Sequence, residues 1–184
     1  MKTIKTTKST KLAKPAEKEK IIRKGLSEKE LELISYLELK GKYFFTVRDA
    51  EPFFKNANER KVYIHRLKKK GRIIKLNKNK YFLVPIKATN GNWSEHPFIL
   101  IDEIMNSKNY AITGKAAANY WKIIDQIPLV YDVWNTKKHK KVQIFNSVLM
   151  FKKHKQKDIP KSVEKEIHNH KFIIATKEES KKWT

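Results

Sequence analysis

The stretch 58–85 combines hydrogen-bonding and cationic side chains with a regular set of large apolar residues. Asn, Lys, Arg and His at helical spacing can hydrogen-bond to base edges and neutralise phosphates, which is the chemistry of nucleic-acid recognition. Helical periodicity places Tyr63, Ile64 and Leu67, with the stem of Arg60, on one buried stripe. The opposite face then presents Asn58, Lys61, Val62, His65, Lys68 and Lys69.

A first helix is predicted between Ser27 and Gly41. Ser27 and Glu30 stand three residues apart, as in a capping box where each side chain satisfies the other's backbone amide. Leu26 and Leu31 occupy the two positions of a hydrophobic staple, and Gly41 suits the end of a helix. The apolar face is expected to comprise Leu31, Leu33, Ile34, Tyr36 and Leu37.

A second start signal is Thr46 with Asp49 three residues later. The short helix that follows, Val47 to about Phe54, contains Pro52. Proline removes one amide donor, so this helix is expected to bend or end there.

A third helix follows a capping Asn, at position 56 or 58, and runs to Lys70, where Gly71 stops it. Two short β runs come next, at 72–76 and 80–84. They flank Asn77-Lys78-Asn79, where Asn is expected to supply the left-handed backbone of a tight turn.

Three helices followed by a hairpin are typical of a winged helix-turn-helix domain. Such a domain lays the polar face of its third helix in the major groove, while the hairpin reaches a nearby phosphate or the minor groove. We therefore expect this part of the chain to bind duplex DNA. The residues assigned to the DNA-binding surface are Arg48, Asn58, Arg60, Lys61, His65, Lys68, Lys69, Lys78 and Lys80.

The composition favours an anionic partner. The chain has 184 residues, a formal charge of +23 and 40% hydrophobic residues, which fits a globular, strongly basic protein. Nucleic acid is the first expectation; an anionic membrane surface, or a Lys-rich composition without a partner, would also account for the charge. The absence of Cys excludes disulfides and thiolate sites and fits a cytoplasmic protein. No apolar run approaches the ~20 residues that span a membrane.

The chain divides into four segments by composition and periodicity. Residues 1–25 are expected to form a basic flexible tail, 26–86 the winged helix-turn-helix domain, 87–94 a linker, and 95–184 a small mixed α+β C-terminal domain. In the last segment, a helix at 97–106 begins near Ser94 or His96. The other elements expected there are a strand at 110–113, a small-residue helix at 114–121, and strands of an antiparallel meander at 129–134, 142–145, 148–151 and 172–175.

Few residues suggest catalysis or metal binding. His168 and His170 could bind a metal from one strand face, but two imidazoles without a third ligand make a weak site. Asp102 and Glu103 lie on an amphipathic helix and are expected to face solvent rather than form an acid–base pair. We therefore expect no enzymatic activity, no metal and no cofactor.

The run from Phe45 to Pro85 resembles the N-terminal winged-helix domain of the AbiEi family of antitoxins, the transcription-regulating halves of type IV toxin–antitoxin systems. The family pattern is "FT…D", then "RLxKKG", then a hairpin ending in Tyr, apolar residues and Pro. Here these are Phe45-Thr46 with Asp49, "RLKKKG" at 66–71 and "YFLVP" at 81–85.

The second half is similar to the C-terminal domain of the same family, through "NYAITGKAAANYW", "VLMFKKHK" and "HKFIIATKEESKKW". The chain stops soon after the last of these, at Thr184, so this domain is expected to be a truncated, antitoxin-like version.

The resemblance implies a repressor that binds operator DNA, usually inverted repeats upstream of its own operon, and counters a cognate nucleotidyltransferase toxin. A homodimer is compatible with such an operator. Three alternatives remain open: a stand-alone winged-helix regulator without a toxin, an RNA-binding or translation-associated basic protein, and a protein-interaction module.

Overall fold

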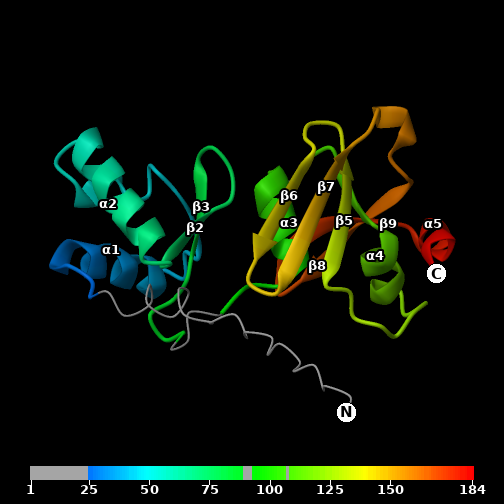
Figure 1. Ribbon diagram of the computed structural model, residues 1–184, viewed down its shortest axis with the longest axis horizontal. Helices are drawn as coiled ribbons and strands as arrows, with labels where there is room; N and C mark the ends of the chain where they lie inside the picture. Colours follow the sequence, from blue (N-terminus) through cyan, green and yellow to red (C-terminus); the bar gives the residue numbers. More distant parts are fainter. Residues whose placement is uncertain (1–24, 89–92, 107) are drawn as a thin grey trace, which may run out of the picture.

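The computed structural model describes residues 25–88, 93–106 and 108–184. The protein is a mixed α+β fold, in which N-terminal helices and a three-stranded antiparallel sheet precede a six-stranded mixed sheet with its own helices (Figure 1). The expected basic tail lies, except for Gly25, outside the described residues, as do four positions of the expected linker. In the described ranges, no helix has the length and apolarity that crossing a bilayer requires.

The N-terminal part, here residues 25–86, contains two α-helices, one 3-10 helix and three short strands. They are α1 (Glu28–Leu39), β1 (Phe44–Thr46), η1 (Glu51–Phe53), α2 (Ala57–Lys69), β2 (Ile73–Lys75) and β3 (Lys80–Leu83). The strand order is β1-β3-β2, and both pairings are antiparallel.

Helix α1 begins at the expected capping box. The Ser27 amide donates to the Glu30 carboxylate at 2.7 Å, and the Glu30 amide donates to Ser27 Oγ. The expected apolar face is confirmed for Leu33, Ile34 and Leu37, but Leu31 and Tyr36 are 46% and 37% exposed. At 3.6 residues per turn these two lie roughly 110° to either side of the buried stripe. That stripe consists of Glu30, Leu33, Ile34 and Leu37.

The expected second helix is reduced to a turn and the single 3-10 turn of η1. Its start signal is confirmed, since the backbone amide and hydroxyl of Thr46 both donate to Asp49 Oδ2 at 2.7 Å. Pro52 lies in the first turn of η1 and Phe54 is already extended. In the expected helix from Val47, Pro52 would lie in the interior, where it has no amide to donate to the carbonyl four residues earlier.

The Asp49 carboxylate gives a pH-dependent prediction. Burial raises its pKa, but the Lys42 ammonium and the hydrogen bonds from Thr46 outweigh burial and lower the pKa from 3.8 to about 2. At 1.36 kcal/mol per unit the shift corresponds to about 2 kcal/mol. Because the Lys42 side chain is half-exposed and solvent screens the pair, Asp49→Asn should lower the free energy of unfolding by about 1–2 kcal/mol near neutral pH. Because the folded-state pKa is depressed, this contribution is full above pH 3.8 and disappears as the pH falls toward about 2.

Urea unfolding of the wild type and Asp49→Asn, at about pH 6 and about pH 2, measures this difference. The two proteins should converge in stability at the lower pH. A difference that persists there would mean that the turn depends on the shape of the Asp49 side chain rather than on its charge.

Helix α2 begins at Asn56, whose side chain accepts hydrogen bonds from the amides of Asn58 and Glu59 at 3.1 and 2.9 Å. It ends before Gly71, whose φ of 70° is the left-handed conformation that glycine adopts without strain. The helix predicted from the sequence is therefore confirmed, with Asn56 rather than Asn58 as its cap.

The C-terminal part, here the described residues from 93 to 184, carries the larger sheet. Its elements are α3 (Pro97–Met105), β4 (Tyr110–Thr113), α4 (Gly114–Tyr120), β5 (Val130–Asn135), β6 (Lys140–Ile144), β7 (Ser147–Lys153), η2 (Gln156–Asp158), β8 (Ser162–Ile167), β9 (His170–Ala175), α5 (Lys177–Ser180) and η3 (Lys181–Trp183). The strand order is β6-β7-β5-β4-β9-β8.

This sheet is mixed, so the expected antiparallel meander is a partial description. The β6–β7 hairpin forms as predicted, but β7 lies beside β5 and runs parallel to it. The reason is burial. Leu149 and Phe151 of β7 are fully buried, which suits an interior position, whereas β6 is largely exposed and takes the edge.

One strand, β8, was not predicted from the sequence. It alternates exposed and half-buried residues and pairs with β9 across a turn in which His168 and Asn169 have φ of 50° and 59°. Two left-handed residues are typical of the tight hairpin turns that match strand twist. Its many charged residues hide the alternation that would have indicated an edge strand.

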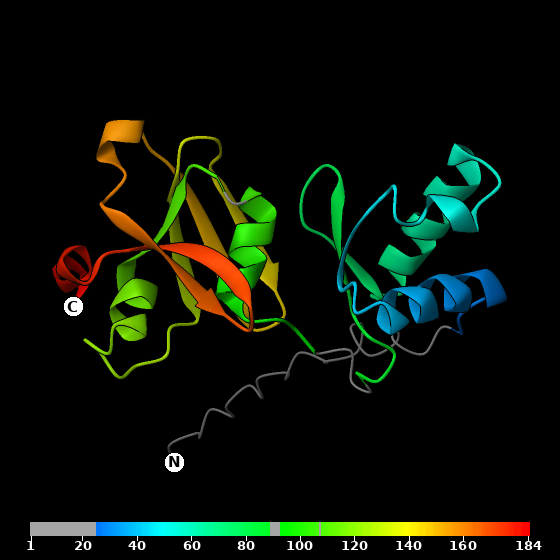
Figure 2. The same ribbon diagram turned by 180° about the vertical axis from the view of Figure 1, so that it is seen from behind.

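A hydrophobic core joins the two parts, beside a second core that the N-terminal part forms alone. Leu76, Phe82 and Val84 belong to the same buried cluster as α3 and the strands of the large sheet. The ring of Phe82, fully buried, stacks on Trp93 with centroids 5.7 Å apart. In Figures 1 and 2, α3 lies between the β2–β3 hairpin and the six-stranded sheet. The hairpin is therefore fixed against the C-terminal part.

Candidate nucleic-acid interface

Helix α2 presents one polar face to solvent. Ile64 and Leu67 are 8% and 0% exposed, and Tyr63 is half-buried, with its ring stacked on Phe54. The inward stripe expected from the sequence is thus confirmed. The exposed side chains of α2 that the sequence assigned to the opposite face are Asn58, Lys61, Val62, His65, Lys68 and Lys69.

Arg60 has a structural contact instead of an exposed position. Its guanidinium forms an ion pair with Glu51 at 2.5 Å, and its side chain is only 15% exposed. This contact ties α2 to η1, so Arg60 positions the helix. Arg48, in the turn before η1, is exposed.

The C-terminal end of α2 is held against α1 by a largely buried ion pair. The Lys70 ammonium donates to the carboxylate of Glu30, which is 1% exposed, and to the Gly25 carbonyl. Burial raises the pKa of Glu30, but the hydrogen bonds from Lys70 and Ser27 outweigh it and lower the pKa overall. Glu30 therefore stays charged and keeps the end of α2 joined to α1.

The hairpin tip is organised by a side chain rather than by left-handed backbone. Asn77 Oδ1 accepts hydrogen bonds from the amides of Asn79 and Lys80 at 3.1 and 3.0 Å. No residue from 77 to 79 has a positive φ, so the expectation of a left-handed Asn was wrong. An Asx turn serves instead, because the Asn carboxamide stands in for a backbone carbonyl.

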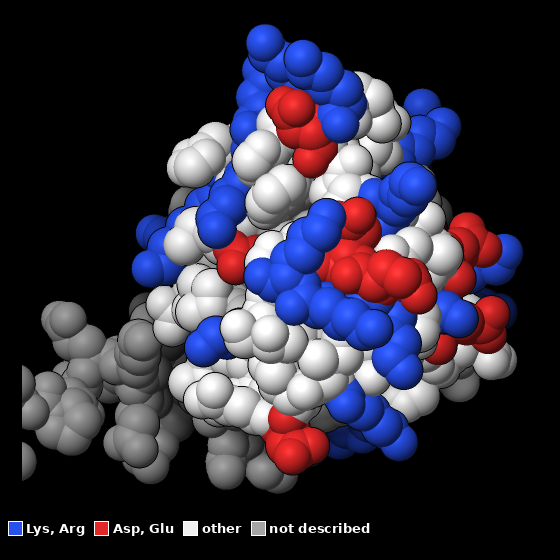
Figure 3. Space-filling model, turned by 90° about the vertical axis from the view of Figure 1, so that its right-hand side faces the viewer, with Lys and Arg blue, Asp and Glu red and all other residues white. Residues whose placement is uncertain are grey.

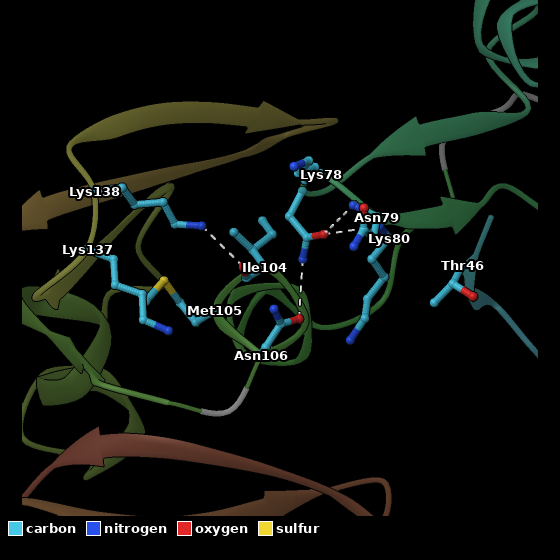
Figure 4. Close-up of a pocket in the computed structure, with 10 residues that line it drawn as sticks. Thr46, Lys78, Asn79, Lys80, Ile104, Met105, Asn106, Lys137 and Lys138 are labelled. Carbon is cyan, nitrogen blue, oxygen red and sulfur yellow. Dashed lines mark hydrogen bonds between the residues drawn. The ribbon is translucent and has the colours of Figure 1, made fainter. Parts of the chain in front are cut away.

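The tip also docks on the C-terminal end of α3 (Figure 4). Asn77 Nδ2 donates to the Glu103 carbonyl at 3.2 Å, and the Lys80 ammonium pairs with the Glu103 carboxylate. From the other side Lys138 donates to the Ile104 carbonyl at 3.1 Å. Asn77 and Lys138 thus satisfy two of the last carbonyls of the helix. Lys80 is thus a docking residue, whereas Lys78 is exposed.

The expectation that Asp102 and Glu103 face solvent was wrong. The Glu103 side chain is only 14% exposed and pairs with Lys80, and Asp102 is buried more deeply. Its carboxylate is 4% exposed, accepts the hydroxyl of Tyr110 at 2.7 Å, and lies 3.3 Å from His170 Nε2. The Tyr110 oxygen accepts the Ile173 amide, and burial together with Asp102 raises the pKa of Tyr110. Helix α3 is buried on nearly every side, so its carboxylate needs these partners.

His168 and His170 do not form a pair on one strand face. His168 lies exposed in the β8–β9 turn, and His170 begins β9 and points to Asp102. Among the residues that the structure describes, no three His, Asp or Glu side chains gather closely enough to hold a metal ion. The Asp102–Tyr110–His170 group joins α3 to two strands.

No family model matches the chain, and no curated protein resembles it significantly. The case for a function therefore depends on the geometry of α2 and of the surfaces around it.

Proposed function

We propose that the chain is a duplex-DNA-binding transcriptional regulator of the winged helix-turn-helix class. The order α1, β1, η1, α2, β2, β3, with β3 between the other two strands, supports this class. In such domains the last helix before the hairpin enters the major groove. Here η1 takes the place of the middle helix.

The observation that carries the proposal is the exposed face of α2. Its amide, imidazole and ammonium groups are free of ion pairs in the described residues, while its neighbours Arg60 and Lys70 are engaged in anchoring. Lys61 and His65 are four residues apart and project from the same face, which suits contact with consecutive base edges. Lys68, Lys69 and the wing residue Lys78 then neutralise phosphates.

A more specific function is proposed from the resemblance of segment 45–85 alone: an autorepressing, AbiEi-like antitoxin that binds operator repeats and counters a nucleotidyltransferase toxin. Expression of the chain together with a nucleotidyltransferase encoded beside it tests this part. Growth rescue would support the antitoxin role. DNA binding without rescue would leave a stand-alone regulator.

Lys61→Ala tests sequence reading by α2. Selection from a random duplex pool first defines a preferred site, and fluorescence anisotropy then gives the affinity ratio between that site and a random duplex. A base contact is worth about 1–3 kcal/mol of discrimination, so the ratio should fall by roughly tenfold.

Two results would contradict this reading. Equal loss of affinity on both duplexes would make Lys61 a phosphate contact. A wild-type protein that enriches no sequence, or that prefers structured RNA at matched salt, would replace the regulator with an RNA-binding or non-specific protein.

A further inference from the structure

A second concentration of positive charge lies outside α2 and the hairpin. Between positions 136 and 160 the sequence has eight Lys and two His but one carboxylate, Asp158. The charge comes from two similar runs, "KKHKK" at 137–141 and "KKHKQK" at 152–157. The segment between the two runs contains the end of β6 and most of β7.

The fold brings these two runs to the same edge. Strands β5 and β7 are parallel, so the segments that follow them leave from the same end of the sheet. Strand β6 begins at that end too, with Lys140 opposite Phe151. The set formed in this way is called the basic edge, and its members are Lys137, Lys138, Lys140, Lys141, Lys152, Lys153, Lys155 and Lys157.

A buried asparagine holds the two runs together. Asn135, 0% exposed, donates to the carbonyls of Lys138 and Lys152 at 3.0 and 3.1 Å and accepts the amides of Lys137 and Lys138. Its own carbonyl accepts the amide of His154 at 2.8 Å. The backbone of the basic edge is thus fixed before any partner binds, which reduces the entropy lost on binding.

The charges of the basic edge are not neutralised within the described part of the protein. Only Lys152 has a carboxylate partner, Asp132 at 2.7 Å. Elsewhere on the described C-terminal part, Lys171 and Lys182 have carboxylate partners, Glu164 and Glu179. Burial, and then the neighbouring lysines, lower the pKa of Lys138. Gathering like charges in this way costs free energy that a polyanion would recover.

The picture of the surface agrees with this imbalance. At the top of Figure 3, at the height where Figure 1 places η2, Lys and Arg predominate. Lower on the same face, positive and negative residues are interleaved. On this face, the imbalance is therefore concentrated at this end of the molecule.

A groove links the basic edge to α2. It has a volume of about 700 Å³ and is lined by Lys68 at the end of α2, by Lys75 and Lys78 of the hairpin, and by Lys140 of β6. In Figures 1 and 2, the hairpin tip, the β5–β6 loop and η2 lie along the same upper edge of the molecule. A nucleic-acid backbone that follows this groove from α2 would pass Lys68, Lys78 and Lys140.

We propose that the basic edge binds the phosphate backbone of the same DNA duplex, beyond the part that α2 contacts. This inference rests on the proposed function and extends it. The C-terminal part adds affinity without reading sequence, because lysine contacts to phosphates carry no base information. The docked hairpin keeps the two surfaces at a fixed distance, so both can engage one duplex.

The test compares two full-length variants with equal loss of charge. In the first, Lys140, Lys153 and Lys155 of the basic edge become Gln; in the control, Lys115, Lys177 and Lys181 of α4, α5 and η3 become Gln. All six side chains are exposed and have no ion pair in the described residues. Affinity for a long random-sequence duplex is measured by fluorescence anisotropy over a series of salt concentrations.

The basic-edge variant should reduce the slope of log affinity against log salt by about 2–3, since each phosphate contact contributes about 0.9. The control should change the slope little. On a duplex only long enough to cover α2, the basic-edge variant should bind like the wild type.

Several outcomes would overturn the proposal. If both variants lower the slope of log affinity against log salt equally, the change in binding comes from net charge alone. Loss of binding to an RNA hairpin or to anionic lipid vesicles, with duplex binding intact, would assign the basic edge to another polyanion. If replacing lysines of α2 abolishes duplex binding but the basic-edge variant leaves it unchanged, the proposed function stands and this inference fails. If the basic-edge variant abolishes duplex binding and the α2 replacements leave it unchanged, the basic edge binds DNA and α2 does not.

Discussion

Replacing Lys61, Lys68 and Lys69 together with Ala is expected to weaken duplex-DNA binding about a hundredfold near physiological ionic strength. Losing the phosphate contacts of Lys68 and Lys69 removes roughly 1.8 from the salt slope, which is about a thirtyfold loss at about 0.15 M salt. Losing the Lys61 base contact adds about fivefold or more on the preferred site, because such a contact is worth about 1–3 kcal/mol. All three side chains are exposed on α2, and Ala is the best helix former, so the helix should persist. Affinity and salt slope are measured on one duplex.

The matched control replaces Lys115, Lys177 and Lys181 with Ala, which removes the same charge from α4, α5 and η3. In Figure 1 these elements lie at the opposite end of the molecule from α2. Far-UV circular dichroism and thermal unfolding verify that both variants stay folded. If the control weakens binding as much as the α2 variant does, long-range attraction by a strongly basic protein is the whole effect, and α2 has no special role.

The local parts of the fold were predictable because their signals are local. The capping box at Ser27 and Glu30, the Asn cap of α2, and the glycines that end both helices all act within four residues. The orientation of α2 followed from the periodicity of its apolar residues. The exposed half of the candidate site could therefore be derived from the sequence alone.

Some contacts engage residues elsewhere in the fold and so take them out of the candidate DNA-binding site. These contacts could not be predicted in this way. Lys80 pairs with Glu103, 23 positions away, and Glu30 pairs with Lys70, 40 positions away. Nothing in the periodicity of either segment indicates the partner. The burial of Asp102 did have a signal: the run "PFILIDEIM" is apolar around the whole helix, and such a helix is buried on all sides.

The basic edge had a partial signal as well. The repeated KKHK pattern is visible in the sequence, but its meaning depends on β5 and β7 being parallel neighbours. A meander in chain order would have placed the segments after β5 and β7 at the same end too, but with β6 between the two strands. The order β6-β7-β5 puts them side by side, where one asparagine can bond to both.

Phe82→Ala is expected to lower the free energy of unfolding by about 4 kcal/mol, the usual cost of removing a fully buried ring. Phe82 belongs to β3 of the N-terminal part, yet it packs in the core of the C-terminal part and against Trp93. If the two parts fold as one unit, the loss should appear in every probe of unfolding. All four Trp lie at position 93 or beyond, so fluorescence reports the C-terminal part.

The measurement is urea unfolding in a Trp93→Phe background, which leaves Trp121, Trp134 and Trp183 as fluorescent probes. Phe45→Ala is the matched variant, because Phe45 is 1% exposed but packs in the core formed by the N-terminal part alone. In one cooperative unit, both substitutions shift the fluorescence midpoint, and circular dichroism follows the same curve. A helix signal lost at lower urea than the fluorescence would show two independent domains. The distance between α2 and the basic edge would then vary, and joint binding to one duplex would lose the advantage of a fixed arrangement.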